Sequence, residues 1–569
     1  MTPLQKLIAA SFLLIASCFV LRAQQPAATP KKTDEPATGV IDGKVVNESG
    51  QPMAGAGVFI RAVNSAGNAR TAFTDVDGNF RISGLEPALY VVTSNAPAYT
   101  SVPTDPATPT YYRIGDTIRI ELIRGGVITG TVTNSVGEPV VAVRVRATLV
   151  RDARGEIPKF TAFGINEQST DDRGMYRIYG LRPGSYIVSA GGAGFSPTFN
   201  PYDGDMPTYA PSTTRDNAAE VAVRSGEDST MDIRYRGESG HTISGTAKVV
   251  GQNGASITLA PAGSPAPLAN TVQALGGRGF AFNGLGDGDY DLVAQEVTST
   301  LISTATMPSL SVSEPKRVSV RGADVTGIEL SPRPLGSISG KIALESSKDP
   351  ECQGKRPPLL AETLIRVQKP DPEKEDWLYT RIFVNSTSPD ASGAFVIRNL
   401  APNKYQLEPR FYARYWYLQS ITITTAAAKP QKIDAAANWT TLKSGEQLAN
   451  VTITLAQGAA SIRGRVPVAE GAAIPAGTSV FLVPAEPDKA DDVLRYFMSE
   501  VGADQTFTFN NLPPGKYLAL IDTQSTTLTK LRQPEGAPTR TKLRRSAEAK
   551  KNDLELKPCQ TVADFQPKP

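Results

Sequence analysis

Residues 169–188, with the sequence STDDRGMYRIYGLRPGSYIV, contain the pattern that decides the fold. Tyr176 and Ile178 alternate with more polar residues ahead of Pro183-Gly184, and Tyr186 follows that pair. Alternating stretches on both sides of a Pro-Gly pair predict two strands joined by a tight corner. Tyr186 begins the second strand, where its hydroxyl is placed to bond back across the corner, as in the tyrosine corners of β-sandwiches.

The same pattern occurs five times along the chain. Each copy reads aromatic-x-apolar-x-x-Leu-x-x-x-x-Tyr, with turn residues between the leucine and the tyrosine. The copies are Phe80/Ile82/Leu85/Tyr90, Tyr176/Ile178/Leu181/Tyr186, Phe280/Phe282/Leu285/Tyr290, Phe395/Ile397/Leu400/Tyr405 and Phe507/Phe509/Leu512/Tyr517. Turn residues at a fixed offset between apolar runs indicate one supersecondary unit that is repeated.

A shorter pattern, Ile-x-Gly-x-apolar, precedes each copy. It occurs at Ile41/Gly43/Val45, Ile128/Gly130/Val132, Ile243/Gly245/Ala247, Ile338/Gly340/Ile342 and Ile462/Gly464/Val466. Even spacing places these residues on one face of a strand, and a glycine there predicts a bend or the close approach of another chain segment. A further alternating strand closes the copies, at Ile118/Ile120/Leu122, Met231/Ile233/Tyr235, Ile328/Leu330, Val451/Ile453/Leu455 and Leu554/Leu556.

The repeat length predicts five small domains. The interval between successive isoleucine anchors is 87 residues from Ile41 to Ile128 and reaches 124 from Ile338 to Ile462. A unit of about 90 residues is the size of a β-sandwich with its own core. We therefore expect an all-β tandem array with repeats at 39–124, 125–236, 237–331, 332–457 and 458–569, the last with a basic tail. Helical periodicity is weak and confined to 489–500 and 542–551.

The first residues form an export signal. Residues 1–24 combine Lys6 with an apolar run of about 15 residues, which is too short for a stable membrane span. Cleavage after Ala23 or Gln24 is one interpretation, and lipidation of Cys18 is the other. Residues 25–38 have the composition of a flexible linker. Because no later segment approaches 18 consecutive apolar residues, we expect no transmembrane span in the mature chain.

Parts of the first two repeats resemble a known family, the carboxypeptidase regulatory-like domain. The similar stretches are GVIDGKV at 39–45, GQPMAGA at 50–56 and TDVDGNF at 74–80, then GEP at 137–139, TDDRGMY at 170–176 and LRPGSY at 181–186. Copies four and five are recognisably similar, whereas copy three reads GGRGF at 276–280 and lacks the aspartate before its hairpin. The resemblance implies seven-stranded, transthyretin-like sandwiches related to carbohydrate-binding folds, in a bacterial envelope protein, and does not imply protease activity.

The composition argues against most catalytic and metal chemistry. Lys and Arg number 59 and Asp and Glu number 56, which gives a net charge of +3. A charge this close to zero does not indicate that the chain binds nucleic acid. His241 is the single histidine, and three cysteines are too few for a Cys-rich metal site. We therefore predict a non-enzyme with no catalytic residue, metal site or cofactor. Asp75/Asp77 and Asp171/Asp172 fit either calcium ligands or hairpin turns, and the short loops favour turns.

Two surfaces are candidates for binding. Aromatic residues outside the repeated pattern offer rings for stacking on sugars. The candidates for sugar contact among them are Tyr202, Tyr209, Tyr415, Trp416 and Tyr417. Packing is the alternative, because Trp416 alternates with its two tyrosine neighbours and one set must point inward on any strand. The basic segment 530–551 is either a solvated helix face or a contact for an anionic cell-surface polymer.

Cys352 and Cys559 are a candidate disulfide. Removal of Cys18 with the signal leaves two thiols in an oxidising compartment, where thiols tend to pair. The bridge would join the fourth repeat to the end of the fifth. Two separate thiols remain the alternative, because the cysteines belong to different expected domains and must bring their Cα atoms within about 7 Å.

These features together predict an exported, non-enzymatic structural or binding protein. The expected location is periplasmic, outer-membrane-associated or extracellular. A polysaccharide is the favoured partner by fold resemblance, and the alternative is a protein–protein scaffold or adhesin that holds an envelope protein. Fold alone does not decide between these partners.

Overall fold

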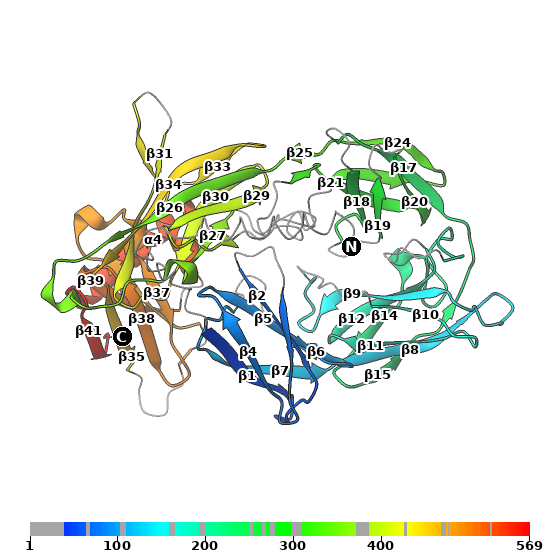
Figure 1. Cartoon of the computed structure of the whole chain (residues 1–569), viewed down its shortest axis with the longest axis horizontal. Coiled ribbons are helices and arrows are strands. Elements are labelled where there is room, and N and C mark those ends of the chain that lie inside the picture. Colours follow the sequence, from blue (N-terminus) through cyan, green and yellow to red (C-terminus); the bar gives the residue numbers. More distant parts are fainter. Residues whose placement is uncertain are drawn as a thin grey trace, which may run out of the picture. The chain divides into compact units, whose positions relative to one another are not determined.

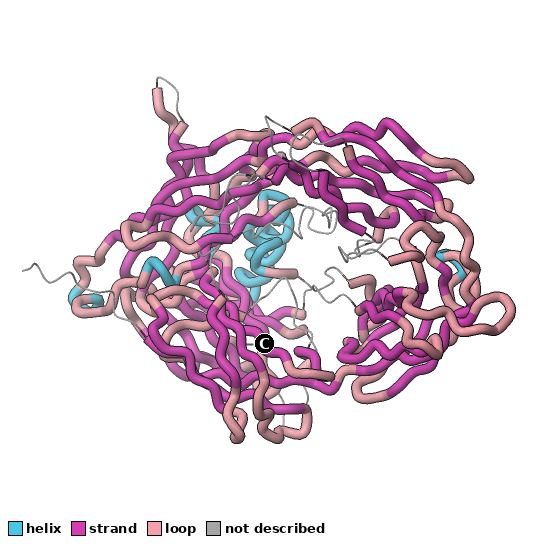
Figure 2. The backbone as a smooth tube through the Cα atoms, turned by 45° about the vertical axis from the view of Figure 1, so that its right-hand side comes forward, coloured by secondary structure: helices cyan, strands magenta, loops and turns pink. Residues whose placement is uncertain are grey.

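A computed structural model of the chain describes residues 39–63, 69–102, 110–158, 166–192, 200–249, 254–264, 269–273, 279–297, 310–370, 386–425, 429–467, 474–475, 477–523 and 526–568. The expected signal peptide (1–24), the linker (25–38) and Cys18 lie outside these residues. Strands make up most of the described chain, and the helices are few and short (Figure 2). The expected all-β tandem array of sandwiches is confirmed.

The described residues of the first repeat form seven strands in two sheets. Figure 1 shows this repeat in blue. The strands are β1 (Gly39–Asn47), β2 (Gly57–Ala62), β3 (Arg70–Phe73), β4 (Asn79–Leu85), β5 (Tyr90–Asn95), β6 (Tyr99–Ser101) and β7 (Thr117–Arg124). The sheet orders are β4-β1-β7-β6 and β3-β2-β5. Ile41 on β1, Ile60 on β2 and Phe80 on β4 meet in one buried core, so the alternating apolar residues of both sheets point inward.

The second and third repeats follow the same plan with nine described strands each. The second has β8 (Gly126–Thr133), β9 (Arg144–Asp152), β10 (Glu167–Ser169), β11 (Met175–Leu181), β12 (Gly184–Ala190), β13 (Thr208–Tyr209), β14 (Glu220–Val223), β15 (Asp228–Thr230) and β16 (Ile233–Arg234), with the short helix η1 (Arg215–Asn217). The third has β17 (His241–Ala247), β18 (Gly254–Pro261), β19 (Ala269–Gln273), β20 (Phe280–Leu285), β21 (Gly288–Val297), β22 (Ser311–Val312), β23 (Lys316–Val320), β24 (Val325–Leu330) and β25 (Arg333–Pro334). Because β25 pairs with β22, the third repeat extends past the expected boundary at residue 331.

The fourth repeat also has nine described strands, and the described residues of the fifth form seven strands and two α-helices. The fourth contains β26 (Gly336–Glu345), β27 (Leu364–Gln368), β28 (Ser386–Thr387), β29 (Ala394–Leu400), β30 (Asn403–Arg410), β31 (Trp416–Thr424), β32 (Lys432–Asp434), β33 (Thr440–Leu442) and β34 (Gln447–Gln457), with η3 (Pro350–Cys352) and η4 (Leu360–Glu362). The fifth contains β35 (Ala460–Arg465), β36 (Ser479–Pro484), β37 (Phe497–Glu500), β38 (Thr506–Leu512), β39 (Gly515–Asp522), β40 (Asp553–Leu556) and β41 (Thr561–Phe565), with η6 (Pro487–Lys489), η7 (Val493–Arg495), α3 (Leu528–Arg532), η8 (Pro534–Gly536) and α4 (Ala537–Lys550). Helix α4 matches the weak helical prediction at 542–551, whereas 489–500 forms short 3₁₀ turns and β37.

The glycine of each Ile-x-Gly pattern lies against a parallel neighbouring strand. A Cβ atom on Gly43, Gly130, Gly245, Gly340 or Gly464 would lie 1.9–2.3 Å from a backbone carbonyl oxygen of that neighbour. In the first repeat the neighbour is β7, whose Ile118 faces Gly43. The predicted close approach of another chain segment is confirmed, and it explains why no side chain fits at this position.

All five corner tyrosines bond back across their corners. The Tyr90, Tyr290 and Tyr405 hydroxyls donate to the carbonyl oxygens of Glu86, Gly286 and Ala401 at 2.7 Å. Tyr186 and Tyr517 donate to Arg182 and Pro513 at 2.9 Å. The predicted tyrosine corner is therefore confirmed in every repeat, and each buried hydroxyl has a partner.

The aspartates before the hairpins form turns. The Asp75 carboxylate accepts the backbone N–H groups of Asp77 at 3.0 Å and Asn79 at 2.8 Å. These bonds, that from Asn79 foremost, lower the pKa of Asp75. Asp171 makes the equivalent bonds to Arg173 and Met175 in the second repeat. The turn interpretation is confirmed, because the carboxylates accept hydrogen bonds from backbone N–H groups of their own loops.

The last repeat closes with a different strand from the expected one. Strand β40, which carries Leu554 and Leu556, pairs with β39. The parallel neighbour of β35 is β41, which follows Cys559. The prediction that Leu554/Leu556 closes the fifth repeat is therefore wrong. Two short alternating segments follow helix α4, and alternation alone does not say which of them reaches β35.

Candidate functional site: the junction of the fourth and fifth repeats

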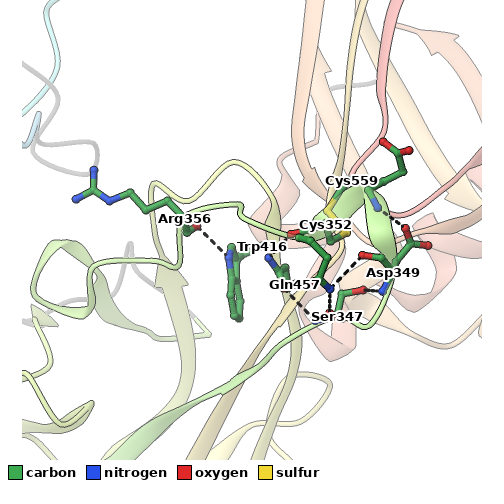
Figure 3. Close-up of a disulfide and its surroundings, with 9 residues drawn as sticks. Ser347, Asp349, Cys352, Arg356, Trp416, Gln457 and Cys559 are labelled. Carbon is green, nitrogen blue, oxygen red and sulfur yellow. Dashed lines mark hydrogen bonds between the residues drawn. A yellow bond between two sulfur atoms is a disulfide. The ribbon is translucent and has the colours of Figure 1, made fainter.

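A disulfide between Cys352 and Cys559 joins the fourth and fifth repeats (Figure 3). Their Cα atoms are 5.4 Å apart, within the range that an unstrained bridge requires. Cys352 ends the 3₁₀ helix η3, which Asp349 caps by accepting the Glu351 N–H at 3.0 Å. Both cysteines are buried, with 0% and 9% of their surface exposed, so the bridge is shielded from solvent.

Polar side chains fix the loop that presents Cys352. The Gln457 amide donates to the Cys352 carbonyl at 2.8 Å and accepts the Ser347 N–H at 3.0 Å. Figure 3 shows Gln457 lying between these two residues. Gln457 is the last residue of β34, so the final strand of the fourth repeat positions the cysteine that bonds to the fifth.

Asn511 makes a second link between the repeats. Its side-chain amide donates to the carbonyl oxygens of Ala413 at 2.7 Å and Trp416 at 2.8 Å. Asn511 has a left-handed φ of 58°, at the position where the first three repeats have glycine with φ of 69–73°. Asn399 occupies this position in the fourth repeat and accepts the Leu310 N–H of the third at 2.9 Å. Sequence reasoning missed this signal: asparagine in place of glycine adds a side-chain hydrogen bond to the preceding repeat.

The helical segment of the fifth repeat also contacts the fourth. Trp439 donates its indole N–H to the Glu535 carboxylate at 2.9 Å, and the Gln406 amide donates to the Arg532 carbonyl at 3.2 Å. Val493 and Leu494 of η7 pack into the core of the fourth repeat. Both apolar packing and hydrogen bonds therefore connect the fourth repeat to the fifth.

A small cavity of about 40 Å³ lies beside this helical contact. Gln406, Glu408 and Arg532 supply polar atoms to its lining. Burial lowers the pKa of the Arg532 guanidinium to about 10, and Glu408 partly opposes that shift. At roughly 10–15 Å³ for each water, the space suits a few water molecules and excludes a larger ligand.

Two of the five candidate sugar-binding residues are buried, which corrects the prediction for them. Trp416 is 2% exposed, and its indole N–H donates to the Arg356 carbonyl at 3.2 Å (Figure 3). Tyr209 is 7% exposed and forms the short strand β13 with Thr208. Neither ring presents a face to solvent, and Trp416 packs in the core of the fourth repeat.

The other three aromatic candidates are half-buried, and Tyr202 and Tyr415 already have ring partners. Lys355 Nζ lies 4.7 Å and Arg414 Cζ 5.5 Å from the centre of the Tyr415 ring. Tyr202 packs edge-on against Tyr235 at 5.6 Å, and its hydroxyl donates to the Val141 carbonyl. Burial raises the pKa of Tyr417. These contacts favour packing over sugar stacking.

His241 lies between two carboxylates rather than beside a nucleophile. Its Nε2 is 3.6 Å from Asp287 and its Nδ1 is 4.0 Å from Asp324. In the described part of the chain, His, Cys, Asp and Glu side chains nowhere gather in groups of three that suit a metal ion.

None of the helices in the described ranges has the length and apolar character needed to cross a bilayer.

Comparison with known proteins identifies part of the chain. Residues 40–110 match the carboxypeptidase regulatory-like domain, and no curated protein matches. Solved structures with similarity include the minor pilin GBS52 of Streptococcus agalactiae, at 11% identity over 35% of this chain and 96% of that one, with a TM-score of 0.19. The TIE protein of Bacillus anthracis is 12% identical over 75% and 76%, with a TM-score of 0.14.

Two B repeat units of the collagen-binding protein of Staphylococcus aureus are also similar. They are 11% identical over 74% of this chain and all of theirs, with a TM-score of 0.13. Scores this low carry no argument about function. The family match at 40–110 and the five repeats of one internal plan agree: the chain is a tandem array of β-sandwich repeats that contains a carboxypeptidase regulatory-like domain.

Proposed function

We propose that this chain is an exported, non-enzymatic structural protein of the bacterial envelope that serves as a scaffold for protein partners. The disulfide between Cys352 and Cys559 is the observation that carries the proposal. Disulfides persist in oxidising compartments and are rare in the reducing cytosol. A covalent bond, a shared core and inter-repeat hydrogen bonds make a stiff pair of sandwiches, which suits a load-carrying or spacing role.

Carbohydrate binding is the less supported alternative. Trp416 and Tyr209 are buried, and cations lie over the Tyr415 ring. Tyr202 and Tyr417 retain partial exposure and are the remaining candidates. An array of neutral glycans with the mature chain separates the two functions: saturable binding that Tyr417→Ala or Tyr202→Ala abolishes favours carbohydrate stacking, and flat binding with a co-purifying envelope protein favours the scaffold.

The export proposal is tested by expression with the chain's own N-terminus in a bacterium with a periplasm. We expect a mature N-terminus near Gln24, recovery outside the cytosol, and a linked peptide pair containing both cysteines in non-reducing mass spectrometry. An unprocessed cytosolic chain whose two thiols both alkylate without reductant would overturn the proposal. Limited proteolysis on the same material tests the repeat boundaries, with cuts expected near residues 125, 237, 335 and 458.

A further inference from the structure

Helix α4 of the fifth repeat presents a positively charged outer face. Its inner face is defined by Leu543 and Ala547, which are buried against Phe481 and Leu520 of the underlying sheet. Residues three or four apart lie on the same side of a helix, as Leu543 and Ala547 do on the inner face. Lys542 and Arg545 are three apart in the other register and therefore lie together on the outer face. Both are exposed, and neither forms an ion pair with the described residues. Packing of the helix therefore decides which of its cations point outward.

Positive charge is concentrated in this segment. Residues 528–551 contain eight Lys and Arg and two Glu, which gives this segment a net charge of +6. The net charge of the whole chain is only +3. The rest of the chain is therefore slightly negative, and the charge on α4 is a local feature. Local charge of one sign is what attracts a polyanion to one place on a near-neutral protein.

A cleft of about 330 Å³ lies along one side of the helix. Arg540, Arg544 and Arg545 contribute to its lining, together with Tyr496, Thr541 and two carboxylates, Asp491 and Glu548. Asp491 interacts electrostatically with Arg540, and Glu548 with Arg544. Arg540 donates to backbone carbonyls, and Arg544 pairs with Glu548 at 3.1 Å. Arg545 is thus the cation of the cleft that is left to pair with an incoming anion. A guanidinium binds carboxylate, sulfate or phosphate through paired hydrogen bonds.

We infer that this surface, the outer face of α4 with its adjoining cleft, binds an anionic polysaccharide. A membrane surface is disfavoured, because the outward residues Thr541, Lys542, Arg545, Glu548 and Ala549 include no large apolar side chain to insert. This inference rests on one part of the proposed function, that the chain is exported, because an exported protein meets anionic polysaccharides outside the cytosol.

The test uses the full mature chain and immobilised polymers of known chemistry. The probes are heparin for sulfate groups, polygalacturonate for carboxylates, and neutral dextran, duplex DNA and anionic vesicles as comparisons. The test variant is the double substitution Lys542→Glu/Arg545→Glu. The matched control is Arg463→Glu/Arg465→Glu, which changes the charge of the same repeat by the same amount at exposed residues of β35.

We expect heparin or polygalacturonate to bind, with dextran silent and binding lost as the salt rises from about 50 to about 300 mM. The α4 variant should weaken binding at least about tenfold, near 1.4 kcal/mol, while the control changes it less than about twofold. Equal loss in both variants, no binding to either polymer, or binding to DNA or vesicles as strong as to the polymers would overturn the inference. Thermal unfolding checks that both variants fold, and cell fractionation reports on export independently.

Discussion

The first and fifth repeats share six strands of one plan and differ in what surrounds them: the seventh described strand joins the sheet of β1 in the first repeat, as β6, and the sheet of β39 in the fifth, as β40. In the first repeat, twelve buried side chains form one core between its two sheets. The fifth repeat has a second buried cluster beneath helix α4, a disulfide to its neighbour, and an asparagine that bonds to that neighbour. Each of these two repeats thus forms its sandwich core from its own residues. The contacts between the fourth and fifth repeats come instead from inserted segments, such as the one that contains helix α3, and from single residues such as Asn511.

The largest effect should come from removing a corner tyrosine. Tyr517→Ala in the fifth repeat and Tyr90→Ala in the first should each cost roughly 3–5 kcal/mol, because a large buried ring leaves a cavity. Hydrogen exchange read repeat by repeat should show opening of the first repeat alone for Tyr90→Ala. Tyr517→Ala should loosen the fourth repeat as well, because core residues cross that junction. If the fourth repeat stays fully protected in Tyr517→Ala, the two repeats are not energetically coupled.

The disulfide should give the next largest effect, confined to the junction. Replacing Cys352 and Cys559 with serine should cost roughly 2–5 kcal/mol, because the bridge restricts the unfolded chain over 207 residues. We expect calorimetry to show a lower unfolding temperature for the last two repeats and an unchanged one for the first. Reductant added to the native protein is the matched control for the serine substitutions. A uniform shift of all repeats would contradict a local role.

A smaller effect should appear at the left-handed position of the hairpin. Gly78 has φ of 75° in the first repeat, and Gln505 has φ of 68° at the same place in the fifth. Gly78→Ala should cost at least about 1–2 kcal/mol, since a Cβ atom disfavours this region and would also lie 2.6 Å from the Val45 carbonyl oxygen. Gln505→Gly should stabilise the fifth repeat by about 0.5–1 kcal/mol, because relief of strain exceeds the added chain entropy. Denaturant unfolding measures both, and a destabilised Gln505→Gly variant would show that the glutamine side chain itself contributes.

The smallest effect should be on acid stability. The pKa of Asp75 in the folded protein lies below its usual value of about 3.8, chiefly because its carboxylate accepts the Asn79 N–H. Its contribution to stability is therefore present above that usual value and is lost as the pH falls through the folded pKa. The Asp75→Asn variant keeps a bonding oxygen and should lose this pH dependence in the first repeat.

Asp504 offers the matching test in the fifth repeat. Its pKa is lowered mainly by the Thr506 hydroxyl, so Asp504→Asn should flatten the acid dependence there and leave the first repeat unchanged. Identical pH profiles for the variants and the parent protein between about pH 5 and 3 would show that these carboxylates do not govern acid stability.

Features that depend on neighbours in the chain were predictable from the sequence. The tyrosine corner, the Asp-Gly hairpin and the glycine beside a parallel strand each follow from a few residues whose backbone geometry has few alternatives. For that reason the sequence alone is enough to recognise the five repeats and their all-β class. The number of short additional strands in the middle repeats could not be predicted from the sequence. Such two-residue strands depend on where an inserted loop packs against a sheet.

The sequence by itself determined the repeated sandwich, since period-two apolar spacing leaves a strand only one way to bury its side chains. Only the tertiary structure decided which alternating segment, β40 or β41, completes the last sheet, and that Trp416 fills a core instead of facing solvent. It also decided that residues 207 apart meet at one junction and which cations of α4 point outward. These outcomes depend on how whole repeats and a helix pack, and spacing along the chain carries no information about packing between segments that fold separately.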